Sequence, residues 1–292
     1  RSLLEKETGL PVLGYLPHLP QAAVESRHLG LKTAGEIADI QQKIDLLAEN
    51  LAVDWEKLAE ITERPAPGHE RLSPQGNFSI VSRIAVARDE AFCFTYAETL
   101  DALRTAGAEL VFFSPVRDAA LPENVCGLYL PGGYPELYAK QLSENTAMLS
   151  SIRQVVNTGL PTAAECGGFL YLGQSLEGAD EKIWPMAGVL PGSGVKVGRL
   201  VRFGYAKMTA KADSMLFRAG ESLHIHEFHH WDSTANGTDF TLKKNESAQW
   251  QGGFANKHLY AGFPHLYWAG TPLPERFVTA AQHYLKTKGQ QK

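Results

Sequence analysis

The chain has 292 residues, of which 44% are hydrophobic and 21% are charged, and this composition excludes collagen, a coiled coil and extended disorder. Its 28 basic residues are spread among 32 acidic ones, and the formal net charge is −4. Such a balance gives no electrostatic grip on nucleic acid or on an anionic membrane, so we expect a small-molecule partner, no nucleic acid and no membrane.

Two helical segments are predicted near the start of the chain. Apolar side chains recur every three or four positions between residues 35 and 51, which is the spacing of one buried helical face. Asp54 then has the character of an N-cap for a further helical stretch that reaches residue 62. A single amphipathic region cannot close a core alone, so we expect residues 1–62 to need a neighbour for their apolar face.

A linker is predicted after this segment. Residues 63–76 contain three prolines and two glycines, a composition that interrupts both helix and strand. We therefore divide the chain into a first segment over residues 1–62, an interdomain linker over residues 63–78, and a second domain over residues 79–292.

The second domain begins with alternating strand and helix patterns. Strand-like runs at 84–87, 109–113, 125–130 and 161–165 are separated by helical stretches, one of them over 96–106. This alternation predicts an α/β fold with a mostly parallel sheet, in which catalytic groups gather at the C-terminal ends of the strands. The last third of the chain is richer in Gly, Thr and aromatic residues, and we expect further strands with long loops there.

A cysteine directly after the fourth predicted strand is the strongest chemical signal. Cys166 is followed by two glycines and an apolar helical stretch, and Ala164 and Gly168 supply the small residues that a tight strand-to-helix turn requires. We expect this nucleophile elbow to project the sulfur, and the helix N-terminus to favour its thiolate. The apolar surroundings of Cys93 and Cys126 predict inert thiols instead.

The number of cysteines and the first residues of the chain indicate the cellular compartment. Three cysteines are too few and too scattered for a disulfide framework, and no Cys-x-x-Cys pair offers zinc ligands. No apolar run approaches the roughly 18 residues of a membrane span. The first residues lack both the apolar stretch of a signal peptide and an initiator Met. We expect a cytoplasmic protein, and we expect this chain to be the trailing part of a longer one.

A glycine-rich loop follows the third predicted strand. In the sequence LPGGY at residues 130–134, Gly132 and Gly133 can turn bare N–H groups toward the end of the neighbouring strand. Such groups stabilise the oxyanion that forms when a thiolate attacks a carbonyl. The N–H of Gly167 is the natural second donor.

Two regions offer a histidine as general base. The first, residues 223–231, formally matches the zinc motif His-Glu-x-x-His but does not keep a helical period. On a strand, His226 and His230 would stand about 13 Å apart at roughly 3.3 Å per residue, too far to share one zinc ion. We therefore predict a polar strand that lines a cleft, with no metal site, and we reject a metalloprotease.

The second region is the apolar and aromatic run at residues 260–268. His265 is a lone polar ring within it. From the residues alone, such a histidine fits either a hydrogen-bonded core residue or a general base.

Four motifs give the second domain a resemblance to a known family. The runs LPGGYPE at 130–136, AECGG at 164–168, RFGY at 202–205 and HEFH at 226–229 stand in the same order in class I glutamine amidotransferases of the cobyrinate a,c-diamide synthase family. Residues 79–271 resemble that family's glutaminase domain. The upstream runs PVLGYLP and RHLGL are similar to the closing segment of its ATP-dependent synthetase domain.

The resemblance implies a fold and an activity. The fold would be a flavodoxin-like, mostly parallel α/β glutaminase domain preceded by a partial P-loop-type synthetase domain. The family uses glutamine-derived ammonia to amidate the a and c carboxylates of cobyrinate in cobalamin biosynthesis, with ATP and Mg²⁺ as cofactors of the full-length enzyme. The sequence contains no Gly-x-x-x-x-Gly-Lys-Ser/Thr, so we expect no ATP or Mg²⁺ site in this chain, which would carry the glutaminase part alone. The missing N-terminal synthetase domain is the implied partner.

The resemblance also assigns residues. Cys166 would be the nucleophile and His265 the base, with Gly133 and Gly167 as oxyanion donors. The wider class has a carboxylate two residues beyond this histidine, where the present chain has Tyr267, so a Cys–His dyad is implied. Glu227 is the candidate orienting residue.

Rival interpretations remain at this point. Nickel-sirohydrochlorin a,c-diamide synthase and cobyric acid synthase amidate similar tetrapyrrole acids by the same chemistry, although the LPGGYPE run favours a diamide synthase. A rival of another class is a non-catalytic binding module that keeps the amidotransferase fold for docking.

Overall fold

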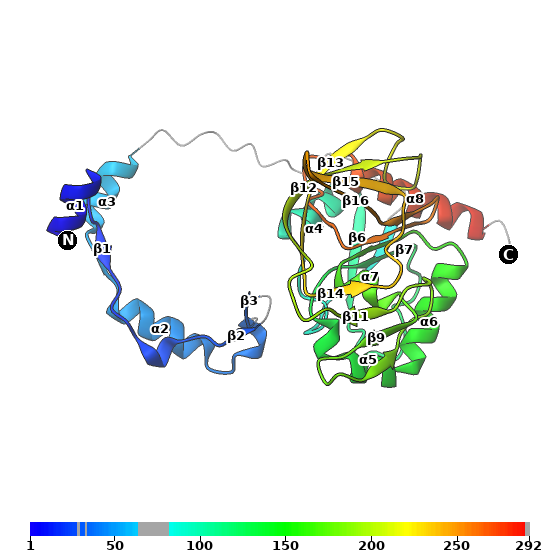
Figure 1. The fold of residues 1–292 in the computed structure, drawn as a ribbon, viewed down its shortest axis with the longest axis horizontal. Helices are drawn as coiled ribbons and strands as arrows, with labels where there is room; N and C mark the ends of the chain where they lie inside the picture. Colours follow the sequence, from blue (N-terminus) through cyan, green and yellow to red (C-terminus); the bar gives the residue numbers. More distant parts are fainter. Residues whose placement is uncertain (28–29, 33, 64–81, 290–292) are drawn as a thin grey trace. The chain divides into compact units, whose positions relative to one another are not determined.

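The computed structural model describes residues 1–27, 30–32, 34–63 and 82–289 (Figure 1). The chain divides into two compact units, Arg1–Leu72 and Ser73–Lys292. The predicted linker at 63–78 lies, except for Glu63, outside the described residues. Within the described ranges, no helix has the length and apolar character that a membrane span requires.

The first unit consists of short elements. Its helices and 3-10 turns are α1 (Ser2–Thr8), η1 (Pro20–Ala22), η2 (Ala34–Glu36), α2 (Ile40–Asn50) and α3 (Trp55–Thr62). Its strands are two residues long and pair antiparallel, β1 (Gly14–Tyr15) with β4 (Ala52–Val53) and β2 (Ser26–Arg27) with β3 (Gly30–Leu31).

The helical predictions for this unit are confirmed in type and corrected in extent. The helix expected between residues 35 and 51 begins only at Ile40, because a 3-10 turn occupies its predicted first residues. Asp54 is an N-cap as predicted, and its carboxylate accepts a hydrogen bond from the backbone N–H of Lys57 at 3.1 Å.

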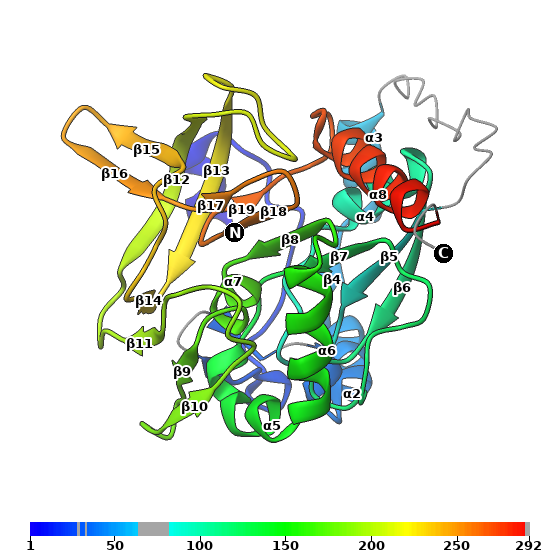
Figure 2. The ribbon, with the colours of Figure 1, turned by 90° about the vertical axis from the view of Figure 1, so that its right-hand side faces the viewer.

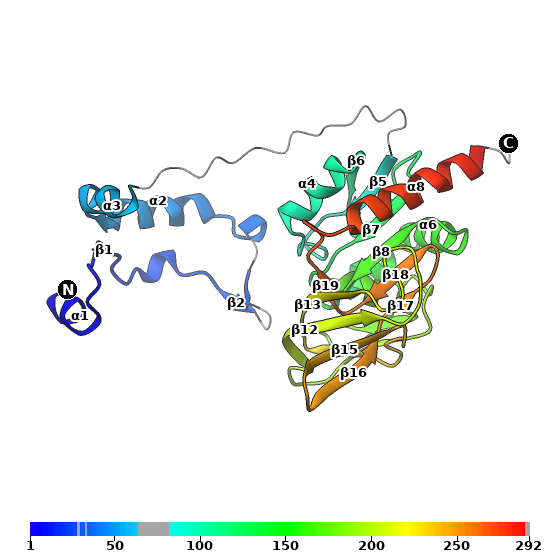
Figure 3. The ribbon, with the colours of Figure 1, turned by 90° about the horizontal axis from the view of Figure 1, so that it is seen from above.

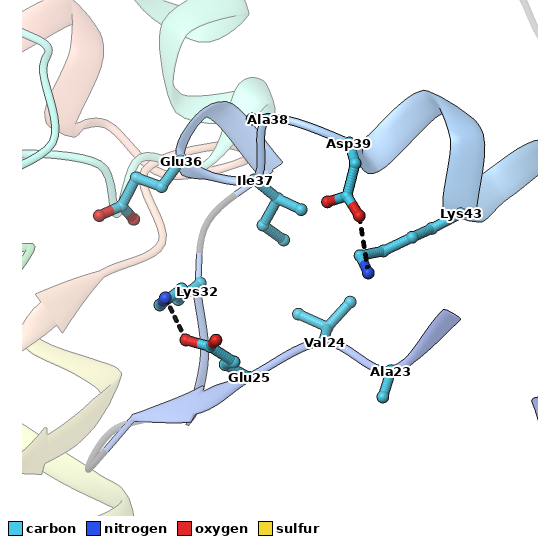
Figure 4. Close-up of a pocket in the computed structure, with 9 residues that line it drawn as sticks. All are labelled: Ala23, Val24, Glu25, Lys32, Glu36, Ile37, Ala38, Asp39 and Lys43. Carbon is cyan, nitrogen blue, oxygen red and sulfur yellow. Dashed lines mark ion pairs between the residues drawn. The ribbon is translucent and has the colours of Figure 1, made fainter. Parts of the chain in front are cut away.

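The apolar side chains of this unit are not covered by its own elements. Neither α2 nor α3 buries a residue, and Ile44 and Trp55 remain 49% and 66% exposed. A depression beside η2 is bordered by charged groups that pair with one another, Lys32 with Glu25 and Lys43 with Asp39 (Figure 4). This unit therefore has no hydrophobic core among its described residues.

A six-stranded, mostly parallel sheet forms the centre of the second unit. Its order is β17 (Phe254–Ala255), β18 (Leu259–Gly262), β8 (Thr162–Glu165), β7 (Gly127–Leu130), β5 (Ser82–Ala87) and β6 (Ala108–Phe113), and only β17 is antiparallel to its neighbour. Each predicted strand is present, with its ends shifted by at most two residues. The mixed α/β architecture with a mostly parallel sheet is therefore confirmed.

Helices cover both faces of this sheet, which is why its strands are apolar along their whole length. Alternate residues of β5 pack into two separate cores. Ile84 and Val86 belong to one core, and Ala85 and Ala87 belong to the other. One face is covered by α4 (Ala97–Thr105) and α8 (Leu273–Gly289), and the other by η3 (Pro135–Leu137), α5 (Ala139–Glu144), α6 (Thr146–Asn157) and α7 (Gly167–Tyr171).

The last third of the chain forms further strands, as predicted, and most of them belong to two additional sheets (Figures 2 and 3). The larger has the order β16 (Ala248–Gly252), β15 (Phe240–Asn245), β12 (Arg202–Ala210), β13 (Ser222–His229) and β19 (His265–Leu266). The smaller has the order β10 (Ile183–Pro185), β9 (Ser175–Glu177), β11 (Gly194–Lys196) and β14 (Trp231–Ser233).

One crossing between sheets positions the candidate site. Strand β18 pairs in parallel with β8, and the chain then passes through Phe263 and Pro264 into β19, where His265 pairs with His226 of β13. The histidine-rich run at 222–229 is thus a strand, as predicted, and its neighbour across the sheet is the second candidate histidine.

Candidate active site

Cys166 lies at the sharp turn between β8 and α7. Its backbone angles are φ 48° and ψ −104°, a conformation that costs energy for a residue with a side chain and that is found at nucleophile elbows. Hydrogen bonds hold it in place, from its own N–H to the carbonyl of Gly262 (2.8 Å) and from the N–H of Leu170 to its carbonyl (3.0 Å). The predicted strand, cysteine and helix arrangement is present.

The glycines around the elbow are required by close backbone approach. A β-carbon at Gly168 would overlap the carbonyl oxygen of Leu130 at the end of β7. One at Gly167 would lie 2.8 Å from the Pro135 ring and 3.0 Å from the backbone nitrogen of Gly133. Only glycine therefore lets the loop after β7 come against the elbow.

Two backbone N–H groups are available at this junction. The N–H of Gly133 is buried and has no acceptor among the described residues, whereas its neighbour Tyr134 donates to the carbonyl of Ala91 at 2.9 Å. The N–H of Gly167 donates toward the sulfur of Cys166. A buried, unpaired N–H is costly unless a ligand accepts from it, so the N–H of Gly133, with that of Gly167 close by, is suited to binding an oxyanion.

His265 and Cys166 both lie next to Gly132. A β-carbon built on Gly132 would be 3.3 Å from Nδ1 of His265 and 3.4 Å from Cβ of Cys166, and it would overlap Cε1 of the imidazole. Phe94 lies beside the imidazole as well, with 6.5 Å between ring centroids. The structure thus brings together Cys166, His265, Gly133 and Gly167, which the sequence predicted as one site.

Burial keeps both reactive side chains neutral. Desolvation, with smaller contributions from His226 and His229, lowers the pKa of His265 to about 4. Desolvation also raises the pKa of Cys166 well above its usual value, and the charge on Glu136 adds to this. The expectation of a thiolate at the helix N-terminus is therefore wrong for the resting protein, because the loss of water outweighs the N–H of Gly167.

Glu227 has other ionic partners than His265. It is 3% exposed, and its Oε2 lies 3.4 Å from Nε2 of His229 and 3.7 Å from Nε of Arg202. His229 in turn stacks on Phe263, with 3.8 Å between ring centroids and 4° between ring planes. The role of Glu227 in orienting His265 stays a prediction.

The described part of the chain contains no group of three or more His, Cys, Asp or Glu side chains that could hold a metal ion. Strand alternation in β13 also turns half-buried His226 and buried Glu227 to opposite faces. The formal His-Glu-x-x-His match therefore has the strand geometry expected from its sequence.

Asp89 is a supporting residue that sequence reasoning missed. Its carboxylate accepts hydrogen bonds from the N–H groups of Ala91 (2.9 Å), Phe92 (3.1 Å) and Val116 (3.0 Å), and from the hydroxyl of Ser114 (2.8 Å). The loop that it shapes is bonded to the glycine loop in two places. The carbonyl of Ala91 accepts from the N–H of Tyr134, and the N–H of Phe94 donates to the carbonyl of Gly132 at 3.0 Å. Its position two residues after a buried parallel strand is the signal that could have identified it.

The comparisons with known proteins agree with this geometry. A mostly parallel sheet with a cysteine elbow beside a histidine places the chain among α/β proteins with a cysteine–histidine pair. Residues 83–272 match the family described as the CobB/CobQ-like glutamine amidotransferase domain, and the chain belongs to this family.

Several similar curated proteins share one name. Proteins named cobyrinate a,c-diamide synthase from Dehalococcoides mccartyi and Caldanaerobacter subterraneus are each 36% identical to this chain, over 97% and 91% of it. One from Thermoplasma volcanium is 34% identical over 99% of it. These matches cover 64%, 60% and 64% of the relatives, so the chain spans about three fifths of the length of the curated relatives it matches. Among solved structures, PurLQS from Thermotoga maritima is 15% identical, with 70% of this chain and 99% of that chain covered and a TM-score of 0.47.

Replacing Asp89 with alanine tests the support of the glycine loop. Loss of the carboxylate leaves several buried donors without an acceptor, and we expect Asp89→Ala to lower the free energy of unfolding by about 1–3 kcal/mol. Urea denaturation followed by tryptophan fluorescence measures this, since four of the five tryptophans lie in the second unit. Asp101→Ala, which removes an exposed pair with Arg104, is the matched control and should change stability little. Equal losses in the two variants would contradict the support role.

Proposed function

We propose that this chain is the glutaminase part of a cobyrinate a,c-diamide synthase, and that it hydrolyses glutamine through Cys166 and His265. The observation that carries the proposal is the closeness of Gly132 to both side chains, next to the N–H of Gly133, which has no acceptor among the described residues. That arrangement supplies a nucleophile, a base and an oxyanion donor around one point.

The first half of the reaction releases ammonia. The sulfur of Cys166 attacks the side-chain amide carbon of glutamine while Nδ1 or Nε2 of His265 takes the thiol proton. The N–H groups of Gly133 and Gly167 hold the resulting oxyanion. When the tetrahedral intermediate collapses, the C–N bond breaks, protonated His265 gives its proton to the leaving nitrogen, and a γ-glutamyl thioester remains on Cys166.

The second half regenerates the thiol. Neutral His265 takes a proton from water, whose oxygen attacks the thioester carbon in the same oxyanion site. The C–S bond breaks, the proton returns to the sulfur, and glutamate leaves. Because the resting pair is neutral, the proton moves only as the C–S bond forms, and no permanent ion pair is needed. Half-exposed Tyr267 occupies the position of the class's third acid, so the mechanism is that of a dyad.

The ammonia would serve an amidation elsewhere in the full-length protein. By analogy with the relatives' name, it would pass to the a and c carboxylates of cobyrinate, activated with ATP and Mg²⁺ by a P-loop-type synthetase domain. Residues 1–62 would be the closing segment of that domain, and their exposed apolar side chains fit a surface that packs on more of it. The reducing cytoplasm is the proposed compartment, in keeping with Cys93, Cys126 and Cys166, which are all described and form no disulfide.

The alternative substrates and the binding-module hypothesis have less support. The names of the similar curated proteins favour cobyrinate over cobyric acid or nickel-sirohydrochlorin. A non-catalytic module would have no use for an unpaired N–H beside a cysteine and a histidine.

An electrophilic glutamine analogue tests the nucleophile. We expect 6-diazo-5-oxonorleucine to alkylate Cys166 alone, as measured by peptide mass spectrometry, because of the three cysteines only Cys166 stands at the strand-to-helix elbow, next to the N–H of Gly167. His265→Ala should slow labelling by about 10²–10⁴. His258→Ala, an exposed histidine at the opposite end of β18, is the control. Labelling of Cys93 or Cys126, or an unchanged rate in His265→Ala, would reject the assignment.

The pH dependence of glutamine hydrolysis tests the state of His265. A base must be unprotonated, and a folded-state pKa of about 4 keeps this imidazole neutral at pH 5, where an ordinary histidine of pKa 6.5 would be charged. We therefore expect kcat/KM to fall as the pH is lowered, with a midpoint near pH 4. Circular dichroism checks that the protein is still folded at that pH. The lowered pKa also means that stability decreases as pH falls from 6.5 toward 4, because the unfolded chain binds the proton first. An acid limb centred near 6.5 would show that His265 titrates as a solvated group.

A further inference from the structure

A buried carboxyl group lies directly beside the proposed nucleophile and has no part in the mechanism above. Glu165 is the last residue of β8 and is 1% exposed. Its Oε1 accepts a hydrogen bond from the indole N–H of Trp268 at 2.9 Å, and its Oε2 lies 3.3 Å from the hydroxyl of Tyr129. The backbone N–H of Leu266 also donates to the carboxyl group.

These partners lie on both sides of the crossing between sheets. Glu165 is the register partner of Gly262, where β18 ends, and the chain then leaves the parallel sheet. His265 belongs to β19, a two-residue strand that, among the described strands, pairs with β13 and no other. Leu266 and Trp268, which follow His265, both donate to Glu165.

We propose that Glu165 is a positioning residue that fastens the His265 segment to the strand carrying Cys166, and so sets the distance between the imidazole and the sulfur. This inference rests on the proposed glutaminase function. Glu165 directly precedes Cys166 in the chain, and its side chain accepts hydrogen bonds from the residues that follow His265. A short edge strand alone cannot fix an imidazole to within the fraction of an ångström that proton transfer requires.

Burial favours a neutral carboxyl in this role, and it outweighs the hydrogen bonds, which favour the charged form. The indole N–H and the Leu266 N–H only donate, and Tyr129 can donate or accept, so a protonated carboxyl can satisfy all three. Burial raises the pKa of Glu165 to about 8, which keeps it protonated at neutral pH. A negative charge here would raise the pKa of Cys166 further and oppose attack by sulfur. Glutamine has nearly the same shape, and its neutral amide can likewise accept from Trp268 and Leu266 and donate to the hydroxyl of Tyr129.

The alternative is that Glu165 has a purely structural role, and this alternative predicts different effects of its substitution. An apolar residue would fill this place without the cost of burying a carboxyl, but it would leave the donors of Trp268 and Leu266 unpaired. If the carboxyl group only stabilised the core, removing it would lower activity no more than any other substitution that costs the same stability. Positioning instead predicts a defect in the chemical step with little effect on substrate affinity.

The experiment compares Glu165→Ala and Glu165→Gln with Ile152→Ala, a fully buried residue of α6 on the other face of the sheet. Glutaminase kcat and KM are measured with thermal melting temperatures. We expect Glu165→Ala to lower kcat by about 10²-fold with KM changed less than about threefold, and Glu165→Gln to restore most of kcat. A kcat loss no larger than that of Ile152→Ala at equal melting temperature, or a Glu165→Gln defect as deep as that of Glu165→Ala, would overturn the proposal.

A second readout does not require turnover. Alkylation of Cys166 by iodoacetamide is measured in Glu165→Ala, His265→Ala and the double variant. If Glu165 acts through His265, the double variant should be no slower than His265→Ala, whereas additive losses would overturn the proposal. Wild-type protein that fails to hydrolyse glutamine would refute the proposed function, and this cycle would still decide the role of Glu165. If Glu165→Ala does not fold, Trp268→Phe, which removes one donor, replaces it in the same cycle.

Discussion

The close approach of the loop after β7 to the cysteine elbow is the constraint on which the rest of the site depends. Side chains at Gly133 and Gly168 would overlap backbone carbonyls, those of Ala91 and Leu130, and one at Gly132 would overlap the imidazole of His265. The strained backbone of Cys166 is held by hydrogen bonds from both sides. Because three backbone segments meet within van der Waals distance, Cys166, His265 and the N–H of Gly133 lie at one junction.

The same closeness sets the electrostatics. Cys166 and Glu165 are buried and His265 is half-buried, and desolvation favours the neutral form of all three groups. A neutral pair is a poor nucleophile until a substrate carbonyl reaches the oxyanion donors. Activation therefore depends on how accurately the groups are placed, which gives the supporting carboxyl groups of Asp89 and Glu165 their importance.

The parts of the site that were predictable from the sequence are local. Apolar runs that alternate with helical patterns predicted the parallel strands, because those strands are buried on both faces. Cys166 and the glycines of the two loops were predictable because small residues at fixed offsets have only one use in a tight turn. The strand at 222–229 followed from the lack of a helical period, and the N-cap at Asp54 from a single side chain.

The parts that were not predictable depend on tertiary contacts. No local pattern places His265 beside Gly132, because that contact arises from the crossing between β18 and β19, so the family resemblance was needed to choose it. The thiolate expectation failed because burial, unlike the helix N-terminus, cannot be read from neighbouring residues. The start of α2 at Ile40 shows that periodicity locates a helix better than it locates its ends.

The central claim is that Cys166 forms a covalent γ-glutamyl thioester within this junction. Radiolabelled glutamine mixed with the chain and quenched in acid within the first turnover tests it most directly. The account predicts label on the peptide that contains Cys166, released by hydroxylamine as a thioester should be and absent from Cys166→Ala. Glutamine hydrolysis that persists in Cys166→Ala, or label carried by another residue, would contradict it.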